Sequence, residues 1–518
     1  MANNSKCLFG TETELALRVE SMGVHRPVPA DWADAILDDV ADRYAHVPSP
    51  QPPPHRRLFL RNGGCVYTDQ GFHPEVASSE HTNPFEQAAQ ALALREIVAE
   101  AADSVGHVYG VGIRVVANNQ DYAFGCPRTY GQHLNFLVRG VTLQLTVEQI
   151  APLLAAMPVI AGSGRLSLAS KEGCFALSQR AAYMAFLLGK RTTAGSRAMI
   201  TQKDEPLCNN GLRLHLLSMS TPISPWQLVL VPAIIGLTLR VIEGGHDIAK
   251  KVTLDDPVRA LHAVSSDPSL KAKLPLAAGG VTTALDILDH YYNTIQRYRN
   301  KVALPDWAGD ILSTWAELMA TLRVDPFCEH GRLDWVQKLL LFTDELQREG
   351  LGWEEFSKWT YVLASVRRLK STFPDLDPLG LTNSATARTQ IRRSALGVLE
   401  RYFAKNKLSW REFPRVWRLA NRLCSLCLEY HTLNPGRYES NCPLVTPQMI
   451  RQARTLPPKG TRAEIRAAAI GNAEAGATAS WTYVSSGGKR LQMLDAFGEQ
   501  ATWENEQKPS KPENQNAT

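Results

Sequence analysis

The chain lacks a strong excess of charge of either sign. Its 56 basic and 51 acidic residues leave a formal net charge of +5 over 518 residues, and so small an excess gives no case for nucleic-acid binding. Apolar residues make up 44% and charged residues 21% of the chain, a balance that excludes a disordered or fibrous protein. The length is enough for two or three domains, or for one large core with an accessory domain.

Cysteine and long apolar runs are also scarce. Nine cysteines, an odd number, are scattered through the chain, which argues against a small disulfide framework and indicates reduced thiols. Cys424 and Cys427 have C-x-x-C spacing without the second pair of a zinc ribbon, so we expect them to pack on a buried helix face. The apolar stretch 226–239 contains Pro232 and, at about 14 residues, falls short of a membrane span. Residues 1–7 lack the pattern of a secretory leader, so we expect a cytoplasmic protein with no membrane partner.

The common nucleotide and hydrolase motifs are missing. Nothing matches the P-loop pattern G-x-x-x-x-G-K-[ST], and no G-x-G-x-x-G follows a strand as a dinucleotide fold requires. Neither G-x-S-x-G nor H-E-x-x-H occurs, which excludes the commonest serine-hydrolase and zinc-protease arrangements. If the chain binds a nucleotide, it does so in another way.

Two acidic residues alternate on the first predicted strand. Segment 8–15 reads LFGTETEL, and residues i and i+2 share one face of a strand. Glu12 and Glu14 are therefore expected to project together.

More acidic residues follow on the next predicted strands. Residues 58–69 carry an Asn-Gly turn between two apolar runs and predict a hairpin in which Tyr67 and Asp69 share a face. Glu75 and Glu80 come soon after. If these segments adjoin the first strand, up to five carboxylates lie near one another, and they need cations such as Mg²⁺ or Mn²⁺ to offset their repulsion. The pattern indicates a magnesium-nucleotide site, with separate solvated strand ends as the alternative.

Several basic and polar residues could meet phosphate or a substrate carboxylate. Arg213 and His215 share a strand face, and Arg180 lies in a Ser-Gln-Arg motif; a planar guanidinium suits phosphate oxygens. His133 with Asn135 is a weaker signal. Each of these residues could instead serve in a structural ion pair.

The order of predicted elements indicates an α+β protein with a largely antiparallel sheet. Besides the hairpin, the patterns predict strands at 112–117, 133–139 and 213–218, and helices at 32–44, 84–104, 147–155, 226–243 and 282–299.

Several segments carry a family resemblance. They include FGTETELAL, FLRNGGCVYTDQGFHPEVASSE, YGQHLNFLVR, ALSQRA, LDWVQKLL, PPKGTRAEIR and SWTYV, in this order along the chain. The chain resembles the Pup ligase and depupylase family, relatives of glutamine synthetase among the carboxylate-amine ligases. The resemblance implies a glutamine-synthetase-like sheet cradle packed with helices over residues 1–444, with a helical insertion at about 356–424. A small C-terminal domain at 445–500 and a disordered tail at 501–518 complete the expected organisation.

The resemblance also implies roles for individual residues. Asp69 takes the place of the catalytic aspartate, and Glu12, Tyr67 and Glu75 take the places of magnesium ligands. The expected ATP contacts are Ser78, Trp481, Arg213 and His215. Further candidates in the same motifs are Glu14, Glu80, Arg180, His133 and Asn135.

The implied reaction is ATP- and Mg²⁺-dependent ligation. In this family ATP phosphorylates the C-terminal glutamate of a small Pup-like protein modifier, and the aspartate helps to deprotonate the attacking lysine of a substrate protein. The expected partners are the modifier, substrate proteins and components of the proteasome system. Two alternatives stay open: a depupylase or deamidase that cleaves the modifier's isopeptide or amide bond, and a catalytically impaired regulatory relative.

The chain departs from the family pattern at several positions. Cys65 stands where the family has an arginine that contacts ATP, Leu134 replaces a glutamate, and residues 219–222 replace a polar stretch. The short segment between Glu14 and the hairpin resembles the ligase branch, whereas the GSGR motif at 162–165 resembles the depupylase branch. Ligation is the preferred interpretation.

Overall fold

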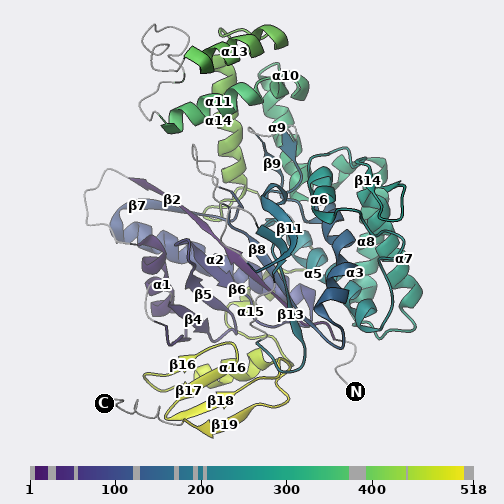
Figure 1. Ribbon diagram of the computed structural model, residues 1–518. Helices are drawn as coiled ribbons and strands as arrows, with labels where there is room; N and C mark the ends of the chain where they lie inside the picture. Colours follow the sequence, from purple (N-terminus) through teal and green to yellow (C-terminus); the bar gives the residue numbers. More distant parts are fainter. Residues whose placement is uncertain are drawn as a thin grey trace, which may run out of the picture.

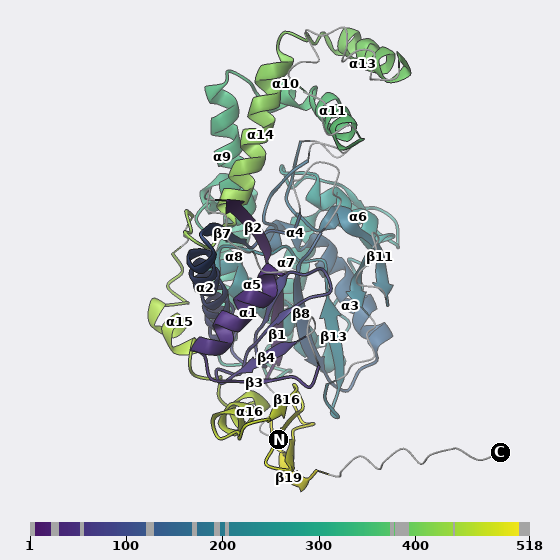
Figure 2. The same cartoon turned by 90° about the vertical axis from the view of Figure 1, so that its left-hand side faces the viewer.

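The computed structural model describes most of the chain. The described residues are 6–21, 31–51, 56–120, 129–167, 174–190, 197–201, 207–372, 378, 393–438 and 441–506. They form a central body, a small domain at one end and a helical arm at the other (Figures 1 and 2).

A nine-stranded sheet runs through the body in the order β11-β12-β13-β8-β1-β6-β5-β4-β3. Every neighbouring pair is antiparallel except β11–β12, which confirms the predicted α+β class. The strands are β1 (Phe9–Glu14), β3 (His46–Pro48), β4 (Arg57–Leu60), β5 (Cys65–Thr68), β6 (Pro74–Ala77), β8 (Gln132–Val138), β11 (Met184–Gly189), β12 (Arg197–Thr201) and β13 (Leu212–Leu216).

The sheet has one face against helices and one open face. On β1 the burial alternates: Phe9, Thr11 and Thr13 are buried, while Glu12 and Glu14 are half-buried. Because successive side chains point to opposite faces, the threonines meet the helices and the glutamates project from the open face. This open face is called the cradle below.

Two long helices support the sheet. They are α2 (Pro84–Tyr109) and α5 (Pro225–Glu243), which contact each other. In α2, Asn83 caps the first turn and Gly110 ends the helix in a left-handed conformation, an ordinary pair of helix-end signals. By length and composition α5 could span a membrane, but 89% of its most apolar window is buried inside the protein. It is the central core helix that the sequence predicted.

Shorter elements complete the body. They are α1 (Trp32–Arg43), α3 (Leu143–Ala156), α4 (Pro158–Ala161), α6 (Pro257–Ser265), α7 (Ala284–Tyr298), α8 (Ala308–Val324), the 3₁₀ turns at Ala181–Tyr183 and Pro326–Glu329, and the paired strands β2 (Ala16–Ser21) with β7 (Val111–Val116), β9 (Arg165–Leu166) with β10 (Phe175–Ala176), and β14 (Leu274–Pro275) with β15 (Val281–Thr282). All the strands and helices predicted from periodicity are present, with ends that differ by a few residues.

The small domain follows the body in the chain. The helix α15 (Pro447–Ala453) packs against α2 of the body. The small domain then contains α16 (Arg462–Gly471) and a four-stranded sheet of β16 (Thr478–Ala479), β17 (Tyr483–Ser486), β18 (Lys489–Gln492) and β19 (Thr502–Asn505). The predicted start of a disordered tail at residue 501 is wrong, because β19 pairs with β18 over four residues. Residues 507–518 lie outside the described part of the chain.

The helical arm projects from the other end of the body (Figure 2). It consists of α9 (Asp334–Arg348), α10 (Trp353–Ser357), α11 (Thr360–Thr372), α13 (Arg393–Asn406) and α14 (Phe413–Tyr430). Buried aromatic side chains form its own core, among them Trp359, Phe413 and Trp417. The described part of the predicted insertion is helical, and its last helix continues six residues beyond the expected end at 424.

Candidate active site

Strand register aligns the candidate residues in two rows on the cradle. One row crosses β4, β5, β6 and β1 as Arg57, Tyr67, Glu75 and Glu14. Two positions along the strands, the second row contains Cys65, Ala77, Glu12 and His133. Both rows follow directly from antiparallel pairing of short strands.

Glu12 is the centre of one polar cluster. Its Oε1 accepts hydrogen bonds from Arg213 Nη2 at 3.0 Å and Asn135 Nδ2 at 3.2 Å. Its Oε2 lies 3.3 Å from His133 Nδ1 and 3.6 Å from His215 Nε2. Burial alone would raise the pKa of Glu12, but the contact with His133 and the charges of His215 and Arg213 hold that pKa well below its usual range. Glu12 is thus a fixed anion with two imidazoles beside it.

A second cluster holds three carboxylates. Oxygen atoms of Glu14, Asp69 and Glu75 lie within 4.8 Å of one another. Burial, together with the charges of Glu14 and Glu12, raises the pKa of Glu75 well above its usual value, and burial beside Glu75 also raises the pKa of Tyr67. Such a set is stable as anions only when a cation offsets the charge.

The clusters divide the predicted magnesium ligands. Glu12, Tyr67 and Glu75 were expected to form one set, but the carboxylate of Glu12 lies with His133 and His215, and Asp69 joins Glu14 and Glu75 instead. The reason is the strand order: β1 has β8 on one side and β6 on the other, so Glu12 and Glu14 turn toward different neighbours. Either group has the donors to hold a divalent cation.

Asp69 is fixed by the turn after β5. Its Oδ1 accepts a hydrogen bond from the backbone N–H of His73 at 2.7 Å, and its Oδ2 lies 3.2 Å from His73 Nδ1. A Cβ atom at Gly71 would stand 2.8 Å from the His73 ring and 3.1 Å from Asp69 Oδ2, so a larger residue would displace the aspartate. These contacts with His73 hold the Asp69 carboxylate in place beside Glu14 and Glu75.

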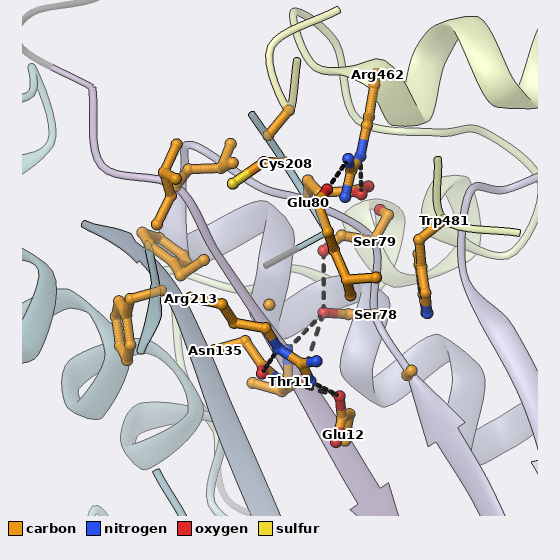
Figure 3. A pocket seen from close by; sticks show the side chains of 18 residues that line it. Thr11, Glu12, Ser78, Ser79, Glu80, Asn135, Cys208, Arg213, Arg462 and Trp481 are labelled. Atoms are coloured by element: carbon orange, nitrogen blue, oxygen red, sulfur yellow. Dashed lines mark hydrogen bonds and ion pairs between the residues drawn. The ribbon is translucent and has the colours of Figure 1, made fainter. Parts of the chain in front are cut away.

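A pocket with about 620 Å³ of empty space adjoins the Glu12 cluster (Figure 3). It lies between the cradle and the small domain, and part of its volume is open to solvent. It is lined by residues of β1, β6, β8 and β13 together with Leu207, Cys208, Arg462, Trp481 and Ala496. Glu12, Asn135 and Arg213 stand at one end and Trp481 on one wall.

Three of the four predicted ATP contacts, Ser78, Trp481 and Arg213, line this pocket, whereas His215 is not among the lining residues. Ser78 Oγ accepts a hydrogen bond from the Thr11 backbone N–H at 2.9 Å. The Trp481 ring packs edge-on against Phe59, with ring centroids 5.2 Å apart, and lies under the guanidinium of Arg466 at 4.9 Å. A flat aromatic wall of this kind can stack against a base.

Glu80 does not belong to the carboxylate cluster, contrary to the prediction. It forms a buried ion pair with Arg462 at 2.6 Å and with Arg466 at 2.8 Å. Burial would raise its pKa, but the two guanidinium groups lower the pKa of Glu80 to about 2. Because both arginines come from α16, Glu80 joins the small domain to the sheet rather than holding a metal.

Arg180 also differs from the expectation. It is fully buried, donates to Leu217 O at 3.2 Å and Thr129 Oγ1 at 2.8 Å, and packs on Gly131, where a Cβ would lie 2.8 Å from its guanidinium carbon. The Gly131 backbone N–H in turn donates to Glu14. Arg180 therefore shapes the backbone behind Glu14 and does not line the pocket.

Arg57 is a cradle residue that the sequence analysis did not identify as a candidate. The guanidinium of Arg57 lies over the Tyr67 ring at 4.6 Å, in the same row as Glu75 and Glu14, and within the described residues it pairs with no carboxylate. Cys65, where the resemblance leads one to expect an arginine, is buried in the apolar cluster beneath Trp481. The alternation of Arg57 with Phe59 on a predicted strand was the available signal.

Two departures from the family pattern lie away from the site. Leu134 is buried on the helix-facing side of β8, so it cannot replace a cradle carboxylate. Thr221 Oγ1 accepts a hydrogen bond from Asn119 Nδ2 at 2.7 Å and is part of a buried structural network.

Comparison with known proteins identifies the family. The model of the Pup-ligase protein family matches residues 8–398, and the chain therefore belongs to the Pup-ligase family. A Pup–protein ligase of Acidimicrobium ferrooxidans is 30% identical over 352 residues, which are 66% of this chain and 74% of the relative. A Pup deamidase/depupylase of Mycolicibacterium smegmatis is 31% identical over 303 residues, which are 57% of this chain and 60% of the relative.

Two solved structures share the fold. The complex between the prokaryotic ubiquitin-like protein Pup and its ligase PafA gives a TM-score of 0.68 with 18% identity, covering 96% of this chain and 91% of that chain. The Pup ligase PafA in complex with ADP gives 0.62 with 18% identity, covering 92% and 94%. At this identity the likeness concerns the fold.

Proposed function

We propose that this protein is an ATP-dependent ligase that joins a Pup-like modifier to lysine side chains of substrate proteins. The observation that carries the proposal is the order of groups along the cradle. A pocket between the sheet and the small domain ends at Glu12, Arg213 and Asn135, and the carboxylates of Glu14, Asp69 and Glu75 stand together on the same face. The cradle thereby offers a pocket for a phosphoryl donor next to carboxylates that can take up a proton.

The cradle residues fit Mg²⁺ together with ATP. The raised pKa of Glu75 reflects buried negative charge that a divalent cation would offset. When bound, such a cation supplies charge stabilisation for phosphoryl transfer. The residues that would hold such a cation are Glu14, Glu75 and Tyr67, or Glu12 with His133 and His215.

The chain's own residues account for the remaining steps. Arg213, held by Asn135 and Glu12, presents a fixed guanidinium at the pocket end for phosphate oxygens. Phosphorylation of the modifier's terminal carboxylate breaks the β–γ phosphoanhydride and leaves ADP and an acyl phosphate. The lysine amine then attacks the acyl carbon, Asp69 takes its proton, and phosphate leaves as the isopeptide bond forms.

The test is modifier-dependent ADP release. We expect purified protein with Mg-ATP, a modifier ending in glutamate and a lysine-bearing protein to form ADP, and Asp69→Asn to lower the rate by about 10²–10⁴-fold. The matched control is Asp42→Asn, which removes an exposed carboxylate from α1 and should leave the rate unchanged. Equal ADP release from wild type and Asp69→Asn would contradict the assignment.

Cleavage of the modifier is the second candidate, because curated relatives of comparable identity are named as depupylases. Asp69 could equally take a proton from water attacking an isopeptide carbonyl. Cleavage of a modifier–lysine conjugate without net ADP formation would favour this function over ligation.

We also propose a cytoplasmic setting and action upstream of a proteasome. The described cysteines are all free thiols, as expected for a reducing compartment. The proteasome link rests on the family resemblance alone, and copurification of tagged protein with proteasome subunits would test it.

A further inference from the structure

The small net charge of the chain hides a strong internal asymmetry. Residues 356–424 contain 14 basic and 4 acidic residues, a net charge of +10. The rest of the chain contains 42 basic and 47 acidic residues, a net charge of −5, which together give the overall +5. The positive charge is therefore concentrated in residues 356–424, the part of the helical arm that follows α9, whereas α9 and α10 are rich in acidic residues.

Part of this charge is used within the arm. On α14, Arg422 makes a two-pronged pair with Glu345 of α9, with nitrogen–oxygen distances of 2.6 and 3.1 Å. Arg415 pairs with Glu349 at 3.4 Å. These pairs fasten α14 to α9, and they show that guanidinium groups on this face accept carboxylate partners.

Other basic residues on the arm are exposed and make no ion pair within the described part of the chain. They include Arg401 and Lys405, one turn apart on α13, Arg411 in the turn before α14, and Arg418 between the two paired arginines. We call these four residues the basic patch. Exposed Tyr361 packs against Tyr402 beside α13, with ring centroids 4.7 Å apart, and adds an aromatic surface next to it.

We propose that the basic patch docks acidic, folded substrate proteins, those that carry the accepting lysine. The proposal rests on the proposed ligase function. Its support is charge complementarity: a cluster of guanidinium and ammonium groups attracts surface carboxylates and raises encounter rates. The patch is not part of the cradle and is not needed for phosphoryl transfer.

The position of the patch determines the size of the partner. Arg418 lies 12 residues, or about 18 Å, along α14 from its base at Tyr430. Figures 1 and 2 show the arm and the small domain at opposite ends of the body. A partner that touches Arg418 and also reaches the body must span at least this length of α14.

The arm is less suited to nucleic acid than to a protein. Glu345, Glu349 and Glu412 are interspersed with the arginines of α9 and α14, and fixed carboxylates repel a continuous phosphate backbone. Most aromatic rings of the arm are buried in its own core, whereas single-stranded binding needs exposed rings for base stacking.

The experiment uses the full-length protein and one carrier protein in two versions, acidic and neutral, with identical lysines. The arm variant is Arg401→Gln, Lys405→Gln, Arg411→Gln and Arg418→Gln. The control variant neutralises four exposed lysines of the body instead: Lys250→Gln, Lys251→Gln, Lys271→Gln and Lys273→Gln. ADP release with hydroxylamine as acceptor measures the cradle alone and should be equal in all three proteins.

We expect wild type and control to conjugate the acidic carrier with about tenfold higher kcat/KM than the neutral one, and the arm variant to lose this preference. Raising the ionic strength from roughly 0.05 to 0.5 M should abolish the preference for the acidic carrier in wild type and in the control variant. An unchanged preference in the arm variant would overturn the proposal. Binding of a labelled RNA that disappears in the arm variant, with carrier preference unchanged, would also overturn it in favour of nucleic acid.

A failure of the ligase function is distinguishable from a failure of the docking surface. If wild type releases no ADP even with hydroxylamine, the ligase assignment fails. Fluorescence anisotropy of the two labelled carriers then still decides the docking question. Tighter binding of the acidic carrier by wild type than by the arm variant supports docking, and equal binding overturns it.

Discussion

The cradle and the helical arm place polar side chains by different means. In the cradle, short antiparallel strands set side chains in register, so that Tyr67 and Glu14 both lie opposite Glu75. At the base of the arm, buried Lys338 donates to the carbonyls of Ser163 and Gly164 at 2.9 and 2.6 Å and lies 2.9 Å from Cys427 Sγ. Residues that share a face of a strand can be predicted from the sequence pattern, whereas contacts between packed elements far apart in the sequence cannot.

The largest expected effect concerns the junction between the cradle and the small domain. Glu80→Ala leaves Arg462 and Arg466 buried without their anion and should lower the free energy of unfolding by about 3–5 kcal/mol. Urea unfolding measures this loss. If stability is unchanged, the small domain does not depend on the ion pair.

The same ion pair should give a pH dependence. Folding lowers the pKa of Glu80 from 4.5 to about 2, so its stabilisation is fully present above pH 4.5 and is lost as the pH falls toward 2. The difference in unfolding free energy between wild type and Glu80→Gln should therefore narrow over that range. If the difference in unfolding free energy does not change with pH, Glu80 stabilises the protein through packing and not through its charge.

The next effect belongs to the cradle itself. Glu12→Gln removes the anion that holds Arg213 and the two histidines, and should lower kcat/KM for ADP release by about 10²–10³-fold with little loss of stability. Glu20→Gln, at an exposed position of β2, is the matched control. Similar rates in both variants would show that the Glu12 cluster is structural.

A change at the arm base separates the two regions. Lys338→Met removes the donor to two buried carbonyls and should destabilise the protein by about 1–3 kcal/mol. Hydrogen exchange should then quicken in α9 and α14, while ADP release with hydroxylamine is maintained. An equal fall in that activity would mean that arm and cradle are one cooperative unit.

The smallest effect tests the unpaired cation of the cradle. Arg57→Ala should weaken ATP binding about tenfold, because a guanidinium stacked on Tyr67 is available for a terminal phosphate, and should leave AMP affinity unchanged. Arg56→Ala, whose side chain pairs with Asp38 on the surface, is the control. Calorimetric titration measures the ATP and AMP affinities of both variants. An equal loss of affinity for ATP and AMP in Arg57→Ala would argue against a phosphate contact.

The comparison also explains which parts of the site the sequence could reveal. Alternation on β1 and the Asn-Gly hairpin were sufficient to predict that Glu12, Glu14, Asp69 and Glu75 share one face. The division of these residues into two clusters depends on which strands flank β1, and that is a long-range property. Glu80 was misassigned for the same reason, since its arginine partners lie more than 380 residues later.

The sequence composition did not predict the strand near the C-terminus or the contacts inside the core. The segment after residue 500 is polar and resembles a disordered tail, yet β19 is stabilised there by pairing with β18. Cys424 and Cys427, one helical turn apart, are both buried as predicted, but the contact between Cys427 and Lys338 could not be read from either sequence segment.

The ratio of ADP formed to isopeptide bonds formed tests the central claim most directly. Full-length protein, Mg-ATP, a modifier ending in glutamate and a lysine-bearing carrier are incubated, and both products are counted by mass spectrometry and chromatography. Ligation through an acyl phosphate predicts one ADP for each bond, with neither product in Asp69→Asn. Loss of preformed modifier–lysine bonds with no matching ADP would contradict it and assign the cradle to hydrolysis.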